Sequence, residues 1–323
     1  MHLSPLAVVL ILVALAFAWS MGAHYTGACM GMPYASGSIA LRPALVTMAV
    51  LVVAGATVAS HGVEVTVGHA LIDAPHVTVA DALAIVAAAF LLTTVYTSLR
   101  VPTSTIQILV FCVVGTALAT GAPIHWPTIL RLAVLWVLAP PIACALGYLC
   151  TRLLDRLVPP ARRAGTGRGV LPTALVAVGA VASFAMGGND VSNATGVFLM
   201  THLFGVVTAG LIGGLALAVG VLTWGKPLLR TVAFDIVQVD LTMASAAQCV
   251  QALVVLVAVA FGYFTSMNQA LIGAMAGTGL ARGRQTVRWG AIAGILKGWA
   301  LGPATALGLS YVLASAFGLV AGH

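Results

Sequence analysis

Long apolar runs recur along almost the whole chain, and they constrain its fold more than any other feature. Of its 323 residues, 61% are hydrophobic and only 7% are charged, whereas about a quarter are charged in ordinary soluble domains. Crossing a bilayer takes about 20 apolar residues in a helix, and several of the runs reach that length: 4–19, 43–60, 79–99, 106–120, 128–150, 170–186, 197–223, 241–264, 269–281 and 289–321. We therefore predict an all-α polytopic protein of the cell (inner) membrane with about 10–12 transmembrane segments, the last run being long enough for two.

The remaining residue types argue against several classes of function. The formal net charge is +7, but the basic residues fall in short loops, where they set membrane topology, so no nucleic-acid partner is implied. The five cysteines form no CxxC pair, which argues against a disulfide frame or a metal centre. Histidines are scattered and acids are few, so we expect neither an enzyme nor a cofactor other than a coupling ion.

The chain carries an internal repeat. Three pairs of segments align in the same order at offsets of 162 to 165 residues: 21–31 with 186–196, 104–119 with 266–281, and 136–149 with 299–312. Chance matches of Leu and Ala are common in so apolar a chain, but ordered blocks at nearly one offset are not. We predict a first transmembrane repeat at 1–150, a basic cytoplasmic linker at 151–169 and a second repeat at 170–323.

The basic residues indicate that the second repeat is inverted. If the Arg-rich linker is cytoplasmic, Arg42 and Arg100 of the first half lie on the same side. In the second half the bases occupy the loops equivalent to the outer loops of the first: Lys226, Arg230, Arg282, Arg284 and Arg288. Asp235 and Asp240, beside Lys226 and Arg230, are expected to balance a cytoplasmic loop. Inverted repeats are typical of secondary transporters, which bind substrate and ion near the midplane, where broken helices meet.

Two matching polar segments open short apolar runs. VPTSTIQ (101–107) and YFTSMNQ (263–269) each precede about 15 apolar residues, a length suited to a re-entrant helix. A helix start offers free N–H donors and the positive end of its dipole, and two of them face to face would form a neutral cage for a tetrahedral anion. Ordinary N-capping is the alternative. The predicted substrate-binding residues are Ser104, Thr105, Gln107, Ser266, Asn268 and Gln269.

A second pair of segments interrupts the apolar pattern. GGNDVSNATG (187–196) carries Asp190 between Asn189 and Asn193, and a carboxylate at membrane depth is costly unless it has a function. We predict that these residues bind the coupling cation, either Na⁺ or a proton at Asp190. A structural Asn/Asp turn is the alternative.

The first-half counterpart, GAHYTGACMG (22–31), lacks the carboxylate. Tyr25 stands where the second half has Asp190, and His24 stands where it has Asn189. One ion site of the pair therefore looks lost unless His24, Tyr25 or Thr26 takes part. His24 could relay protons, but it could equally be a hydrogen-bonded histidine of the core.

At these motifs the chain resembles the inorganic phosphate transporter (PiT) family. GGNDVSNATG is similar to its GANDVANA signature, and VPTSTIQ and SMNQALIGAMAGTGLARGR resemble its PTST-SH and STTH…GLARGR stretches, with Gln at both His positions. WGKPLLRTVAFDIVQVD is similar to the family linker ending in ITELDP. The first-half MGAHYTGACMGMPYASGSI instead resembles the sulfate-permease (CysP-type) branch.

The resemblance implies cation-coupled uptake of a tetrahedral oxyanion. With a single retained Asp, the expected function is import of sulfate by symport with H⁺ or Na⁺, with inorganic phosphate as the second candidate substrate. An uncoupled anion channel or an exporter on the same scaffold is the other alternative. The resemblance also implies a homodimer in the lipid bilayer.

Overall fold

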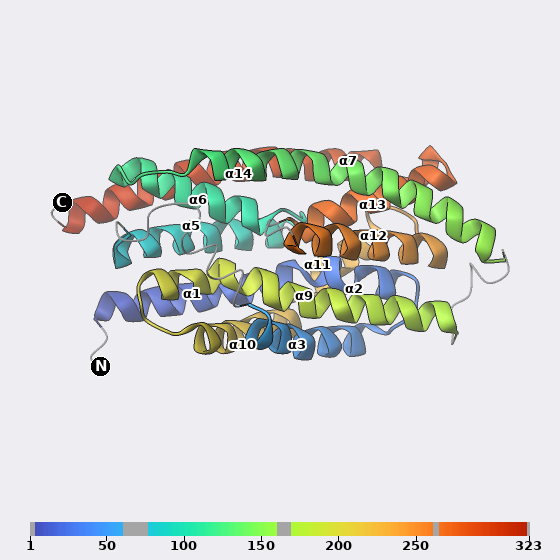
Figure 1. Cartoon of the computed structure of the whole chain (residues 1–323), viewed down its shortest axis with the longest axis horizontal. Coiled ribbons are helices and arrows are strands. Elements are labelled where there is room, and N and C mark those ends of the chain that lie inside the picture. The colour runs from blue at the N-terminus through green and yellow to red at the C-terminus, as the bar shows by residue number, and fades with distance from the viewer. Residues whose placement is uncertain (1–3, 61–76, 160–168, 261–264, 322–323) are drawn as a thin grey trace.

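The described part of the chain is almost entirely helical. The computed structural model describes residues 4–60, 77–159, 169–260 and 265–321, and these contain one isolated β-bridge and no strand. Most helices run parallel to the long axis of the molecule (Figure 1). Their bounds are α1 Pro5–His24, α2 Thr26–Ala35, α3 Leu41–Val58, α5 Val79–Ser98, α6 Thr105–Thr120, α7 Trp126–Leu157, α9 Val170–Met200, α10 Val206–Trp224, α11 Lys226–Phe234, α12 Leu241–Ala260, α13 Met267–Arg282, the 3₁₀ turn η2 Arg284–Thr286, and α14 Trp289–Ala321.

Eight helices of the described residues are long and apolar enough to cross a membrane, with α1 and α2 counted as one. This confirms a polytopic helical membrane protein, although the number is lower than the 10–12 expected. The run 289–321 forms the single helix α14 and not two crossings, because Pro303 lies inside the helix without ending it. Neighbouring elements can satisfy the freed backbone group in a membrane protein. The helix α6, at 16 residues, is too short to count as a crossing.

The main helix pairs join one half of the chain to the other, and equivalent helices form equivalent pairs. The helix α7 packs against α13 of the other half, and α14 packs against α6; in the same way α3 packs on α9, and α10 on α1. Both termini lie at one end of the molecule, whereas the ends of α7 and α9 that flank 160–168 lie at the other (Figure 1). These pairings are those that a two-fold relation between the halves would produce. The loop 61–76 and residues 160–168 of the predicted linker lie outside the described residues.

Glycines at equivalent positions allow two pairs of helices to touch backbone to backbone. A Cβ added at Gly22 would overlap the carbonyl oxygen of Leu217, and one added at Gly187 would overlap that of Val52. At the repeat offset of 165 residues, Gly187 is equivalent to Gly22 and Leu217 is equivalent to Val52. The same contact therefore occurs twice, with the two halves exchanged. Small residues allow membrane helices to approach this closely, so the Gly residues of the two polar segments are explained by packing.

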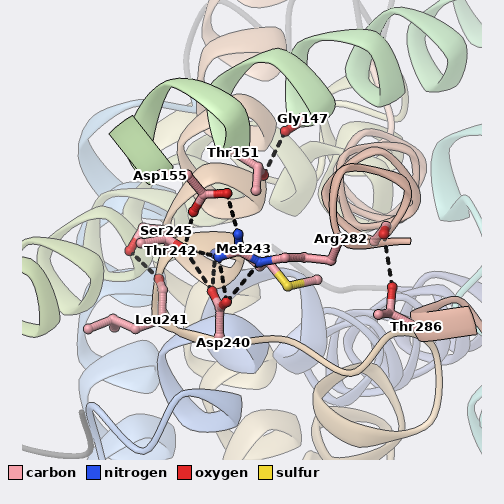
Figure 2. A network of polar contacts seen from close by, with 11 residues as sticks. Gly147, Thr151, Asp155, Asp240, Leu241, Thr242, Met243, Ser245, Arg282 and Thr286 are labelled. Carbon is pink, nitrogen blue, oxygen red and sulfur yellow. Dashed lines mark hydrogen bonds and ion pairs between the residues drawn. The ribbon is translucent and has the colours of Figure 1, made fainter. Parts of the chain in front are cut away.

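An ion-pair network joins three helices at the end of the molecule that carries the flanks of 160–168. Arg282, the last residue of α13, donates to Asp155 of α7, and its Nη2 lies 2.6 Å from Oδ2 of Asp240 (Figure 2). Oδ1 of Asp240 accepts the backbone N–H of Met243 at 2.8 Å and so caps α12. Asp235 and Asp240 thus pair with bases of the predicted loops, although the described residues show no such pair with their neighbours Lys226 and Arg230. Arg282 and Arg288 are the partners, because the fold brings the end of α13 and the following turn back to them.

Candidate functional site

The predicted helix starts are confirmed at both short apolar runs. Ser104 is the N-cap of α6 and Ser266 the N-cap of α13, and each hydroxyl oxygen accepts the backbone N–H three residues later at 3.3 Å. N-capping uses only a lone pair of the hydroxyl. The hydroxyl hydrogen of each Ser is left available for an anion, so capping and binding do not exclude one another.

The two helix starts lie near the middle of the molecule, and α6 and α13 run from there toward opposite ends (Figure 1). Nε2 of Gln269 donates to Oε1 of Gln107 at 3.2 Å, and Nδ2 of Asn268 donates to the carbonyl oxygen of Thr103 at 2.7 Å. All the predicted substrate-binding side chains are buried, and Oε1 of Gln269 has no hydrogen-bond partner. The structure thus brings together two sets of residues that are about 160 positions apart in the sequence.

The predicted cation residues lie on α9 with their oxygens unpaired. Asn189, Asp190 and Asn193 are each less than a tenth exposed, and Oδ1 of Asn189, Oδ2 of Asp190 and Oδ1 of Asn193 have no hydrogen-bond partner. Nδ2 of Asn193 donates to Oδ1 of Asp190 at 3.4 Å. Unpaired buried polar atoms are rare, because each loses its hydration without replacement. Three such oxygens, one from a carboxylate, are a donor set that suits a hard cation such as Na⁺.

Tyr25 connects the two sets of residues. Its side chain is fully buried, its hydroxyl is hydrogen-bonded to Oγ1 of Thr105 at 2.7 Å, and it interacts electrostatically with the Asp190 carboxylate. A residue and its repeat equivalent face each other when they lie near a two-fold axis. The alignment of Tyr25 with Asp190 is therefore the sequence signal for this contact.

His24 and Thr26 make contacts of a structural kind. Nε2 of His24 accepts the backbone N–H of Thr103 at 3.1 Å, and its Nδ1 lies 2.8 Å from Oγ1 of Thr97, which itself donates to a backbone carbonyl. The hydroxyl of Thr26 lies 2.7 Å from the carbonyl oxygen of Gly225. Both ring nitrogens are engaged, which favours the core-histidine interpretation of His24. The ring holds the segment that leads into α6.

Sequence reasoning overlooked a pair of buried glutamines on α12. Nε2 of Gln248 donates to the carbonyl oxygen of Ala28 at 3.1 Å and to Oε1 of Gln251 at 2.8 Å. Oε1 of Gln248 and Nε2 of Gln251 have no partner, and both side chains are fully buried. Two amides three residues apart in an apolar run were a detectable signal, because polar groups at membrane depth are costly.

The protein is a helical membrane protein with a buried polar centre between two short helices, and the comparisons with known proteins place it in the class of inorganic anion transporters. The family model described as the phosphate transporter family matches residues 21–173 and 166–310. The chain therefore belongs to the phosphate transporter family, and the resemblance found in its motifs is confirmed.

Individual relatives carry different substrate names. The chain is 28% identical over 309 residues to the sulfate permease CysP of Bacillus subtilis (strain 168), covering 95% of this chain and 87% of that protein. It is also 28% identical over 307 residues to a probable low-affinity inorganic phosphate transporter of Mycobacterium bovis, covering 91% and 73%. A solved structure, the sodium-dependent phosphate transporter, matches with a TM-score of 0.86 at 20% identity over 98% of this chain and all of that one. This last match shows the shared fold.

Proposed function

We propose that the chain is a secondary active transporter that imports sulfate across the cell membrane by symport with Na⁺ or H⁺. The observation that carries the proposal is the meeting of two helix starts, through Gln107 and Gln269, beside the unpaired oxygens of α9. We further propose that residues 1–150 and 170–323 are inverted repeats. The exchanged helix pairs and glycine contacts support this relation.

In this proposal the anion lies between the N-termini of α6 and α13. Backbone N–H groups, the hydroxyls of Ser104 and Ser266, and the amides of Asn268 and Gln269 supply neutral donors. A cage without fixed positive charge binds a divalent anion only moderately, which lets the anion leave again. The charge of the anion is offset by a cation bound nearby.

Asn189, Asp190 and Asn193 would hold that cation. Their oxygens supply the coordination that Na⁺ needs, and Asp190 alone could instead take up a proton. Binding of the cation would restore partners to three buried oxygens and would neutralise the carboxylate at membrane depth. Both effects favour a state in which cation and anion are bound together, which is what symport requires.

Inorganic phosphate is the second candidate substrate, and one observation favours it. Hydrogen phosphate carries a P–OH group that needs an acceptor, whereas sulfate has none. Oε1 of Gln269 is a buried acceptor without a partner. Discrimination of this kind depends on whether a site satisfies every polar group of the anion. Competition of labelled sulfate uptake by phosphate, thiosulfate and molybdate separates the two, and preferential phosphate transport would overturn the sulfate assignment.

Uptake of labelled sulfate into proteoliposomes tests the coupling. We expect accumulation only with an inward Na⁺ or H⁺ gradient, and we expect Asp190→Asn to abolish the accumulation. Asp81→Asn is the matched control, because Asp81 is partly exposed at the start of α5, and nearly the whole length of that 20-residue helix separates it from the segment that leads into α6. Equal sulfate entry with and without either gradient, together with an unaltered Asp190→Asn variant, would indicate an uncoupled channel.

A further inference from the structure

A large basic hollow lies beside the polar centre and is not part of it. Its volume is about 680 Å³, and residues from α2, α11 and the α5–α6 connection line it. The lining residues that matter are Tyr34, Arg100, Lys226, Arg230, Phe234 and Asp235. Lys226 and Arg230 lie four residues apart on α11, and Arg100 comes from the other side.

Within the described ranges, the three cationic side chains of the hollow form no ion pair with an acid. Asp235 is the one acid in the lining, and its Oδ1 lies 3.5 Å from Nη1 of Arg288. Among the residues that the structure describes, no ion pair joins Arg100, Lys226 or Arg230 to a carboxylate. Like charges gathered around one hollow repel each other and create a positive potential there. An anion in the hollow would relieve this repulsion.

Arg100 occupies a backbone position that disfavours its side chain. Its φ is 57°, in the left-handed region, and it ends α5 with the paired bonds Arg100 N–H to Thr97 O and Val101 N–H to Tyr96 O. This arrangement usually has Gly at the left-handed position, because a Cβ is strained there. A charged residue in a strained position next to a site is an observation that points to function.

The hollow is adjacent to the proposed transport site. Arg100 precedes the N-cap Ser104 by four residues, and a fully extended chain of that length spans at most about 14 Å. On the other side, Lys226 follows Gly225, whose carbonyl oxygen accepts from Thr26, the residue next to Tyr25. An anion in the hollow is therefore within a short diffusion step of the helix starts.

We infer that this hollow is a second binding site for a tetrahedral divalent oxyanion, held by Arg100, Lys226 and Arg230 at the mouth of the transport site. The inference rests on the proposed function for the identity of the anion and for its onward movement, but not for binding in the hollow. Exposed charges bind hydrated anions through long-range attraction, so exchange is fast and sensitive to salt. The phosphate of an anionic lipid headgroup offers the same chemistry.

Crystals soaked in selenate would locate both sites directly. We expect two anomalous peaks in the wild-type protein, one between α6 and α13 and one in the hollow. In the double variant Lys226→Gln/Arg230→Gln, the second peak should disappear and the first remain. Absence of the hollow peak from the wild type overturns this inference, whereas absence of the central peak overturns the proposed function. A hollow peak that persists in the double variant, or a peak touching none of the three cations, marks an adventitious ion only.

A kinetic test needs no crystals. Sulfate exchange is measured in phosphatidylcholine proteoliposomes at ionic strengths of about 10 mM and about 150 mM, where the Debye length is about 30 Å and about 8 Å. We expect the double variant to lose roughly 3- to 10-fold in kcat/KM at low ionic strength and much less at high ionic strength, at unchanged maximal rate. Arg152→Gln/Arg156→Gln is the control, because it removes two exposed charges that do not line the hollow. Equal salt dependence in both double variants overturns the inference.

Two further arms exclude loss of folding and lipid binding. Arg100→Asn removes a charge from a left-handed position that tolerates Asn, so this variant should fold as well as the wild type. Like the double variant, it should exchange sulfate more slowly than the wild type at low ionic strength. Replacing part of the lipid with phosphatidylglycerol tests the headgroup. One result would contradict the inference: phosphatidylglycerol lowers the wild-type rate to that of the double variant and leaves the rate of the double variant unchanged. A lipid would then occupy the hollow, and the assignment to a soluble oxyanion would be wrong.

Discussion

Replacing Tyr25 by Phe removes the hydroxyl that links the predicted anion-binding residues to the predicted cation-binding residues. This hydroxyl is hydrogen-bonded to Thr105 and interacts with the carboxylate of Asp190. Without a cation, we expect Tyr25 to donate to Asp190 and to accept from Thr105, which ties up the Thr105 hydrogen. A cation on Asp190 would release Tyr25 to donate to Thr105, whose own hydrogen could then turn to the anion.

The size of the effect follows from this single hydrogen bond. Hydrogen bonds to charged groups contribute about 1.5–3 kcal/mol, and about 1.4 kcal/mol corresponds to a factor of ten in affinity. The measured quantity is the factor by which the coupling cation raises sulfate affinity. Tyr25→Phe should reduce this factor by about tenfold or more. The smaller factor should come from sulfate affinity without the cation, which should rise in the variant because the Thr105 hydrogen is no longer held by Tyr25. Sulfate affinity with the cation bound should change much less.

Sulfate binding to the purified protein, measured with and without saturating coupling cation, gives this factor directly. Tyr96→Phe is the matched control, because the Tyr96 hydroxyl makes no hydrogen bond to any described residue and its ring packs beside Gly298 and Gly302. If Tyr25→Phe leaves the factor unchanged, or if Tyr96→Phe reduces it equally, coupling does not pass through the Tyr25 hydroxyl.

Three predictions concern stability, each read as a change in the detergent melting temperature or in the free energy of unfolding. Gly187→Ala should destabilise the protein by about 1–3 kcal/mol, because its Cβ would overlap a carbonyl oxygen of α3. Gly308→Ala, where a Cβ would meet open space, should be neutral or stabilising. Equal effects of the two changes would refute the packing role of Gly187. Arg282→Gln should lower stability more than Arg284→Gln, because only the former leaves two carboxylates without a cation. Ser266→Ala should cost about 1 kcal/mol through loss of the N-cap and should also weaken sulfate binding. A loss of stability without weaker binding would leave Ser266 as a cap alone.

Much of the site could be predicted because its signals are local. Ser104 and Ser266 mark helix starts through N-capping and the short apolar runs behind them, and Asp190 stands out because carboxylates are rare at membrane depth. The repeat then predicted that these segments meet. Tyr25 was noticed as a substitution for Asp190, but its contact with Thr105 depends on how two halves pack.

The features that sequence reasoning missed depend on three-dimensional partners. Arg282 was assigned to a loop, and nothing local indicates that it pairs with Asp155 and Asp240. For the same reason nothing in the sequence indicates that Arg100 joins Lys226 and Arg230 in one hollow. Fewer of the described helices are long enough to cross a membrane than the 10–12 expected, because run length alone cannot tell one long helix, such as α14, from two short crossings.

The replacement of one Asp by Tyr25 has a consequence for the energetics of transport. With Asp190 as the one acidic residue of the two paired segments, we expect one cation to accompany each sulfate, so that one net negative charge enters per cycle. An inside-negative potential of about 100 mV opposes that movement by about 2.3 kcal/mol, which lowers steady-state accumulation by about 50-fold. Proteoliposomes with a potassium diffusion potential set by valinomycin measure this directly, with the Na⁺ or H⁺ gradient held constant. No response to the potential would mean two cations per sulfate, and faster uptake would mean three or more. Either result would show that groups other than Asp190, such as the unpaired Oε1 of Gln248, help to bind a further cation.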